Sequence, residues 1–293
     1  TMKRRNFFRS LALGGASVAF SPIVKAVPAV QADKEKPATN IKDALAVPRK
    51  ENSMPGKYPG KVARTTHPGC IVDGQPSEEA AYEMLRSCML NLTGKSNLKE
   101  AWLQLVGPDD VIGLKVHAIA GKLLSTSHAL TQSIINQLEE AGISRKNVII
   151  WDRREADLKE SGFTTENYPD IKIIGTEYQD EKGSYINAEG KFYGEGRIDK
   201  EQYFSVDLEG EYDAYTMPFM INGRKNSYFT KICPEMVTKI INVPFLKNAG
   251  TTITCCMKNL AFGSITNTAR LHGPMWHDTC ASVCAFPPLR DKV

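Results

Sequence analysis

Two lysine–asparagine pairs lie in a part of the chain that otherwise has the composition of a protein core. Lys247-Asn248 and Lys258-Asn259 are eleven positions apart, and apolar residues surround them. A lysine among buried side chains costs several kcal/mol unless an anion compensates its charge. We therefore expect these four residues to bind a small anionic molecule or an anionic cofactor. The alternative is that Asn248 caps a helix and that Lys258 lies on a solvated face.

A second basic centre lies in the apolar segment 110–116, which contains Lys115 and is followed by His117. Residues two apart share a face of a strand, so we expect the lysine to bind an anion and the histidine to transfer a proton or bind a metal. The alternative is a lysine that reaches the sheet edge and a histidine with a structural role. Asp152, followed by Arg153, comes after the apolar run NVIIW. It is expected either to orient a histidine or bind a cation at the site, or to cap the next helix.

One cluster combines the side-chain types that bind transition metals. Its members are His272, His277, Cys280 and Cys284. In a helix the last three would share a face, and zinc or a soft transition metal accepts both side-chain types. His272 is also a candidate for acid–base catalysis. The spacing matches no strong zinc motif, so a disulfide from Cys280 or Cys284 to a distant cysteine such as Cys70 is an equal alternative.

The chain contains seven cysteines, an odd number. It has no CxxC pair and no ferredoxin-like run, which argues against an iron–sulfur cluster held by this chain alone. Cys255 and Cys256 are predicted to fill core volume.

The first 32 residues have the pattern of a twin-arginine signal peptide. Arg4-Arg5 precede Phe7-Phe8, a short apolar run follows, and Ala32 ends an A-x-A-like cleavage site. The run is too short to span a membrane, so we expect an exported, periplasmic protein with no transmembrane span after cleavage. An ordinary secretory signal or an amphipathic helix is the alternative. Twin-arginine export carries folded proteins, which allows a metal or redox cofactor without requiring one.

The basic balance of the chain comes mostly from this leader. The formal charge of the whole sequence is +4. Residues 1–32 hold five basic residues and no acid, so removing them leaves +4 − 5 = −1. We find no basic patch of the kind that binds nucleic acid.

The periodicity of apolar residues predicts an α/β fold. A strand at 110–116, a helix from Ser127 to Ala141 closed by Gly142, and a strand at 147–151 form a βαβ unit with parallel strands. His117 and Asp152 would then follow the carboxyl ends of neighbouring strands, where open α/β sheets bind ligands. Further predicted strands are 61–66, 171–174 and 239–243, and further predicted helices are 77–92, 98–106, 233–237 and 251–262.

The composition divides the chain into three parts. Residues 33–60 are predicted to form a linker or an extended arm. Residues 61–293 are predicted to form a single α/β domain with a mostly parallel sheet and flanking helices. An irregular, β-rich insertion is expected at about 178–220 within it.

Four segments of the domain resemble the family catalogued as domain of unknown function 362. They are DDVIGLKVHAIAG, LSTSHALTQSIINQLEEAGISRKNVIIWDR, KIINVPFLKNAGTTITCCMKNLAFGSI and ARLHGPMWHDTC. The resemblance implies an α/β fold and fits a branch in which twin-arginine leaders are common. Some relatives carry an attached iron–sulfur domain that is not in this sequence. Relatives also continue beyond LRDKV, so this chain is expected to be truncated at its C-terminus. A fainter similarity to the nickel-pincer lactate racemase family lies in strand–helix order only.

Three functional hypotheses follow, the third being that the chain is truncated so far that it is inactive. The first is an exported enzyme, metal- or redox-assisted, that acts on a small anionic molecule at the sheet edge. The second is a non-catalytic periplasmic binding protein, or an assembly partner of a respiratory complex that contacts a redox protein.

Overall fold

A computed structural model describes residues 36–119, 121–191, 193–208, 225–249, 252–273 and 275–293. The predicted signal peptide, residues 1–32, lies outside the described residues. Residues 37–293 form one compact unit, to which all the elements below belong. No helix of the described residues is long and apolar enough to cross a membrane.

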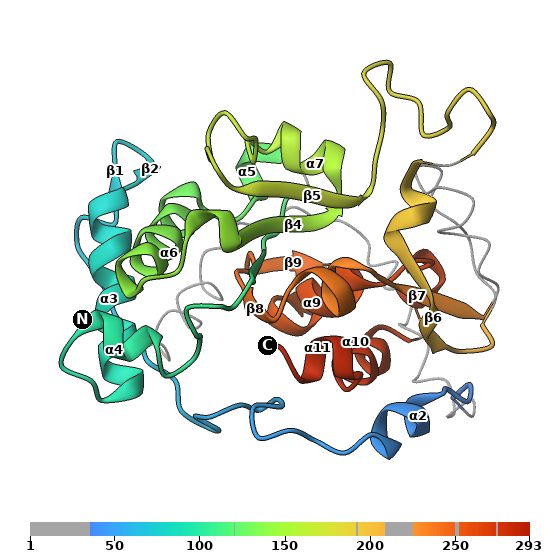
Figure 1. Cartoon of the computed structure of the whole chain (residues 1–293), viewed down its shortest axis with the longest axis horizontal. Coiled ribbons are helices and arrows are strands. Elements are labelled where there is room, and N and C mark those ends of the chain that lie inside the picture. The colour runs from blue at the N-terminus through green and yellow to red at the C-terminus, as the bar shows by residue number, and fades with distance from the viewer. Residues whose placement is uncertain (1–35, 120, 192, 209–224, 250–251, 274) are drawn as a thin grey trace, which may run out of the picture. The chain divides into compact units, whose positions relative to one another are not determined.

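The centre of this unit is a sheet of four parallel strands in the order β5-β4-β3-β8 (Figure 1). The strands are β3 (Ile112–Lys115), β4 (Val148–Arg154), β5 (Lys172–Glu177) and β8 (Lys239–Asn242). The predicted α/β class and parallel βαβ unit are therefore confirmed. The chain runs outward from β3 to β5 and then returns to the other side of β3. This reversal is a topological switch point, where such sheets bind ligands.

Strand alternation divides the core between the two faces of the sheet. Ile112 and Leu114 of β3 and Ile150 of β4 are buried in one apolar cluster. Helices α3 (Glu78–Thr93), α4 (Leu98–Trp102) and α6 (His128–Ala141) contribute most of the helical residues of this cluster, and α7 (Glu155–Glu160) adds Leu158. Ile149 and Trp151, the neighbours of Ile150 in β4, point to the other face of the sheet and belong to the second apolar cluster. Residues of α9 (Cys256–Ser264), α10 (Trp276–Cys284) and α11 (Pro287–Arg290) complete that cluster. Lys115 alternates with Leu114 and therefore faces α9.

The caps of α6 form as the sequence predicts. The Ser127 hydroxyl accepts a hydrogen bond from the N–H of Leu130, and Gly142 ends the helix with φ = 102°, the left-handed region that glycine favours. Ser77 caps α3 in the same way. The helix predicted at 98–106 is shorter and ends at Trp102. The strand predicted at 61–66 is wrong, since these residues pair with no strand and Val62 is 90% exposed.

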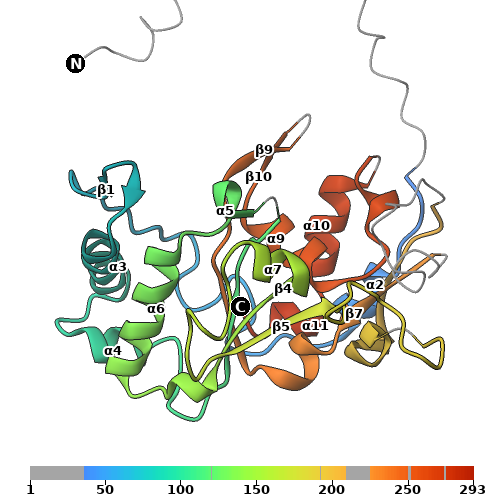
Figure 2. The same ribbon diagram turned by 90° about the horizontal axis from the view of Figure 1, so that it is seen from above.

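The remaining elements lie around the sheet (Figure 2). The predicted insertion contains β6 (Ile198–Ser205), which pairs antiparallel with β7 (Asn226–Thr230) beyond the predicted end of the insertion, and residues 209–220 of the insertion lie outside the described residues. The short elements are α2 (Ile41–Ala46), β1 (Ile71–Val72), β2 (Gln75–Pro76), α5 (Gly121–Leu124), η1 (Arg145–Asn147), α7 (Glu155–Glu160), η2 (Tyr193–Arg197), β6 (Ile198–Ser205), β7 (Asn226–Thr230), η3 (Ile232–Met236), β9 (Lys247–Ala249), β10 (Thr252–Thr254) and η4 (Ala269–Leu271).

The segment predicted as a linker or arm is bound to the end of the described chain. The buried guanidinium of Arg290 donates to the carbonyl oxygens of Ala44, Val47 and Pro48, each at 3.1 Å. The N–H of Met54 donates to the Arg290 carbonyl at 2.7 Å. Since a buried guanidinium needs acceptors, these carbonyls hold the segment against the domain as an arm.

Candidate functional site

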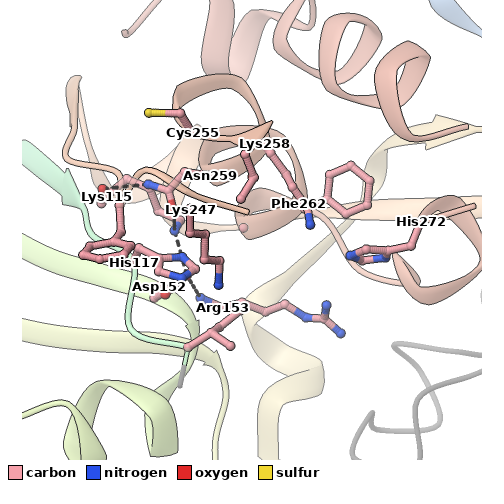
Figure 3. A pocket seen from close by; sticks show the side chains of 14 residues that line it. Lys115, His117, Asp152, Arg153, Lys247, Cys255, Lys258, Asn259, Phe262 and His272 are labelled. Atoms are coloured by element: carbon pink, nitrogen blue, oxygen red, sulfur yellow. Dashed lines mark hydrogen bonds and ion pairs between the residues drawn. The ribbon is translucent and has the colours of Figure 1, made fainter. Parts of the chain in front are cut away.

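A pocket of about 100 Å³ opens at the carboxyl ends of β3 and β4, below α9 (Figure 3). Its lining residues come from five separate parts of the sequence: Lys115, His117, Ile119, Asp152, Arg153, Phe245, Lys247, Thr254, Cys255, Lys258, Asn259, Phe262, Gly263 and His272. Most of the residues predicted for the site are among them. The volume is small beside the roughly 300–1,000 Å³ of drug-sized pockets, so the site suits a ligand of few atoms.

Lys115 forms the floor of the pocket with its side chain only 1% exposed. Its ammonium donates to the Val116 carbonyl and to Asp152 Oδ1, both at 2.7 Å, and to Asn259 Oδ1 at 3.0 Å. These three bonds use all the donors of an ammonium group. Lys115 was predicted to bind a ligand directly, but here it contributes charge, and every hydrogen bond that it can donate goes to the protein.

Asp152 lies within β4, two residues before its end, and not after the strand as the sequence predicted. Its Oδ1 accepts from Lys115 and the N–H of Arg153, and its Oδ2 accepts from the N–H of Ala118 at 2.8 Å. Burial alone would raise the pKa of this carboxyl, but the Lys115 ammonium and the two backbone donors hold it below its ordinary value. Asp152 is therefore a fixed anion that neutralises Lys115.

Asn259 of α9 connects the Lys115–Asp152 ion pair to that helix. Its Nδ2 donates to the carbonyl of Lys115 at 3.2 Å and to Asn242 Oδ1 at 2.8 Å, while its Oδ1 accepts from the ammonium. One turn later, Gly263 faces the same ammonium. A Cβ at this position would overlap Cε of Lys115 and lie 2.7 Å from its Nζ. The close approach of α9 to the sheet thus requires glycine here.

Lys247 reaches the pocket from a β-hairpin. The sequence predicted a turn here and a helix from 251, but β9 and β10 pair antiparallel and α9 begins only at Cys256. Lys247 lies opposite Thr254 in the hairpin, so both face the pocket. Asn248 alternates to the other side, is exposed and does not line the pocket. Burial lowers the pKa of Lys247, with Asp152 opposing the shift.

Lys258 enters from the first turn of α9 and is held by aromatic rings. Its Nζ lies 3.5 Å from the centroid of the Trp276 ring and 5.4 Å from that of Phe262. Within the described residues it contacts no carboxylate. Burial lowers its pKa to about 8, and the charge of Lys247 adds to this effect against an opposing contribution from Cys280. Trp276 was not identified from the sequence, because nothing in its neighbourhood marks it as a partner of Lys258.

Arg153 lies at the side of the pocket and is paired with a buried acid. Its Nε donates to Glu177 Oε1 at 2.9 Å and its Nη1 donates to Thr268 Oγ1 at 2.6 Å. Glu177 is 1% exposed. Charge pairing therefore balances Lys115 against Asp152 and Arg153 against Glu177. Lys247 and Lys258 are the two pocket cations without an acidic partner among the described residues, so the pocket is short of negative charge.

His117 is the neutral base of this site. Burial lowers its pKa to about 4; Asp152 opposes the shift, and Lys247, Lys115 and Lys258 add to it. Its Nε2 is buried and has no hydrogen-bond partner in the described structure. A neutral imidazole has one acceptor nitrogen, so near pH 7 this side chain could accept a proton from a bound ligand.

His272 lies at the rim, exposed on one side. Its Nδ1 contacts the carbonyl of Thr268 at 2.9 Å and its ring meets Phe262 and Trp276 edge-on. In the neutral ring this carbonyl selects the tautomer in which Nδ1 donates. Burial lowers the pKa of His272, and Lys258 and Arg153 add to this, while its backbone hydrogen bonds oppose it.

The predicted metal cluster does not come together. Cys280 and Cys284 are buried in the core against α9, whereas His277 and His272 are exposed. No three His, Cys, Asp or Glu side chains of the described residues are grouped so that they could hold a metal ion. All seven cysteines lie in the described residues and are free thiols in this structure, Cys70 included.

The prediction that Cys255 and Cys256 fill core volume is wrong. Cys256 is exposed, and Cys255 lines the pocket with its Sγ 3.7 Å from that of Cys256. The hairpin delays the start of α9, which leaves both residues at the exposed N-terminal end of the helix.

Burial raises the pKa of the Cys233 thiol to about 12. Burial and the neighbouring Cys255 also raise the pKa of the Cys256 thiol, but Cys256 is exposed whereas Cys233, Cys280 and Cys284 are buried. We therefore expect iodoacetamide to alkylate Cys256 under native conditions and to leave Cys233, Cys280 and Cys284 unmodified until the protein is denatured, as peptide mass spectrometry would show. Equal labelling of Cys256 and Cys233 under native conditions would contradict this arrangement.

The pocket thus combines two cations that lack acidic partners in the described part of the chain, a neutral histidine and a buried ion pair beneath them. Such a set can bind an anionic group and exchange a proton with it. Comparison of the chain with protein-family models, with curated proteins and with solved structures finds no match.

Proposed function

We propose that this protein is an exported enzyme that binds a small anion, such as a carboxylate, and transfers a proton to or from it. Lys247 and Lys258 hold the anionic group, and His117 accepts the proton. The observation that carries the proposal is the presence of these two cations, without acidic partners among the described residues, in one pocket at the switch point of the sheet. The twin-arginine leader, on which the periplasmic location depends, is part of the proposal.

The distribution of charge in the pocket favours a ligand-binding role over a structural role. Structural ion pairs are closed, as Lys115 shows with three protein acceptors. Lys247 and Lys258 repel each other and are each partly desolvated. Their charge is an energetic cost to the empty protein that a bound anion would relieve.

Removing the Lys258 charge is expected to weaken anion binding about 10- to 100-fold, because a hydrogen bond to a charged group contributes roughly 1.5–3 kcal/mol. The change is Lys258→Met, and isothermal titration with lactate and with inorganic phosphate measures it. Because the pKa of Lys258 is about 8, affinity in the unmodified protein should fall as pH rises through that value. The variant should lack this step.

The matched control is Lys200→Met, which removes an exposed lysine on β6 that is paired with Glu195 of η2. It should bind both probes as the unmodified protein does. Equal affinities for the Lys258 variant and the unmodified protein would remove Lys258 from the site. Failure of the unmodified protein to bind any small anion would refute the proposed function.

A further inference from the structure

Lys258 differs from Lys115, the buried lysine of the same pocket, in that its amine has no hydrogen-bond acceptor among the residues that the structure describes. Lys115 Nζ donates to three oxygens, but Lys258 Nζ contacts only ring faces in the described structure. It also projects into the pocket, where Figure 3 shows it near Lys247 and His272. An amine in this position is free to approach a bound molecule.

We propose that Lys258 Nζ attacks the carbonyl carbon of a small oxo acid bound in the pocket and forms an imine with it. This inference depends on the proposed function, since it requires an anion in the same pocket. It adds the substrate class, a 2-oxo acid, and a covalent role for Lys258.

The electrostatics of the pocket favour this reaction. An amine attacks only when it is unprotonated, and burial beside the Lys247 cation lowers the pKa of Lys258 to about 8. A desolvated lysine next to another cation is a known way to activate an amine for imine formation. Lys115 cannot take this role because its ammonium is held by Asp152.

The pocket also contains cationic groups that can bind the carboxylate of an oxo acid. Protonated Lys258 contributes to holding the anion, but once it has lost its proton the carboxylate of the ligand would lie against Lys247 and the guanidinium of Arg153, which also line the pocket. The carbonyl carbon next to that carboxylate can then face Lys258. A volume of about 100 Å³ restricts the ligand to a short chain.

His117 completes the proton balance. The unprotonated amine adds to the carbonyl carbon, and His117 carries one proton from the nitrogen to the carbonyl oxygen, which gives a neutral carbinolamine. A second proton, equivalent to the one that the lysine ammonium released to solvent, is delivered by His117 to the hydroxyl, which leaves as water while the nitrogen lone pair forms the C=N bond. The overall change is an amine, a carbonyl and one proton giving a protonated imine and water. The buried Nε2 of His117, which has no partner in the described structure, is suited to hold the proton between the two steps.

The test is reductive trapping on the full chain. Pyruvate with sodium cyanoborohydride converts an imine into a stable secondary amine, and peptide mass spectrometry locates it. We expect one N-(1-carboxyethyl) group, at Lys258, in at least about tenfold excess over any surface lysine, because this amine is desolvated and lies beside the Lys247 cation, whereas surface lysines are solvated. Lys258→Arg should abolish this group, and Lys200→Arg should not.

Two outcomes separate this inference from the proposed function. If calorimetry shows that lactate and pyruvate bind but the label is absent or spread evenly over surface lysines, imine formation is refuted and anion binding stands. If neither anion binds, both are refuted. Mapping the label on the unmodified protein does not depend on whether any variant folds.

Discussion

Replacing Asp152 with asparagine is expected to lower the free energy of unfolding by about 3–5 kcal/mol, the usual cost of removing one partner of a buried ion pair. The Lys115 ammonium would keep its charge without a counterion, with only 1% of its side chain exposed. The asparagine amide also has one acceptor oxygen in place of two. It could not accept from both Lys115 and the N–H of Ala118. Urea unfolding followed by circular dichroism measures the loss.

The pH dependence of stability should change with it. The pKa of Asp152 is lower in the folded protein than in the unfolded chain. Its contribution is therefore fully present above the unfolded value of about 3.9 and is lost as pH falls through the lower, folded value. The unmodified protein should lose this contribution in acid, and the asparagine variant should lack that part of the acid transition.

The control is Glu139→Gln, which removes an exposed carboxylate that lies 3.5 Å from Arg145. Exposed pairs of this kind contribute roughly 0–1 kcal/mol, so this variant should unfold close to the unmodified protein. Combining Asp152→Asn with Lys115→Met removes both buried charges and should recover part of the loss. If Asp152→Asn is no more destabilising than Glu139→Gln, Lys115 and Asp152 are not a buried pair.

Adding a single methyl group at Gly263 is expected to destabilise the protein by about 3 kcal/mol or more, the sum of overpacking and a disturbed ion pair. Helix propensity alone would favour alanine over glycine by about 1 kcal/mol. The new Cβ, however, would overlap the Lys115 side chain, which cannot move without breaking its bonds to Asp152 and Asn259. The urea midpoint measures the sign and size of the change.

Gly196→Ala is the matched control, since a Cβ there meets no atom within 4 Å and its φ lies outside the left-handed region. It should be neutral or slightly stabilising. A Gly263→Ala protein that is as stable as this control would show that α9 lies farther from Lys115 than the structure places it.

The parts of the fold with strong local signals could be predicted from the sequence. Apolar periodicity and the Ser127 and Gly142 caps defined the βαβ unit. Residues at the ends of its parallel strands must meet at one edge, which brought Lys115, His117 and Asp152 together in the prediction. The segment 247–254 was interpreted wrongly as a turn and a helix start. Its β-branched run, Thr251 to Thr254, favours a strand and should have indicated the hairpin.

Other features depend on tertiary contacts that no local pattern reveals. The face of α9 that carries Asn259 and Gly263 is defined only by how closely the helix packs on β3. The position of Trp276 over Lys258 depends on α10 packing beside α9. Helical spacing made Cys280 and Cys284 look like metal ligands, but that face of α10 is the one buried in the core.

The binding of the arm to Arg290 has a consequence for the order of folding. The acceptors on residues 44, 47 and 48 leave the ribosome early, whereas the guanidinium that they require is made 242 or more positions later. Until residue 290 has left the ribosome these carbonyls lack the guanidinium, so the arm can dock only after that point. Contacts this distant in sequence are expected to form slowly. Docking of the arm would then be a late step in folding.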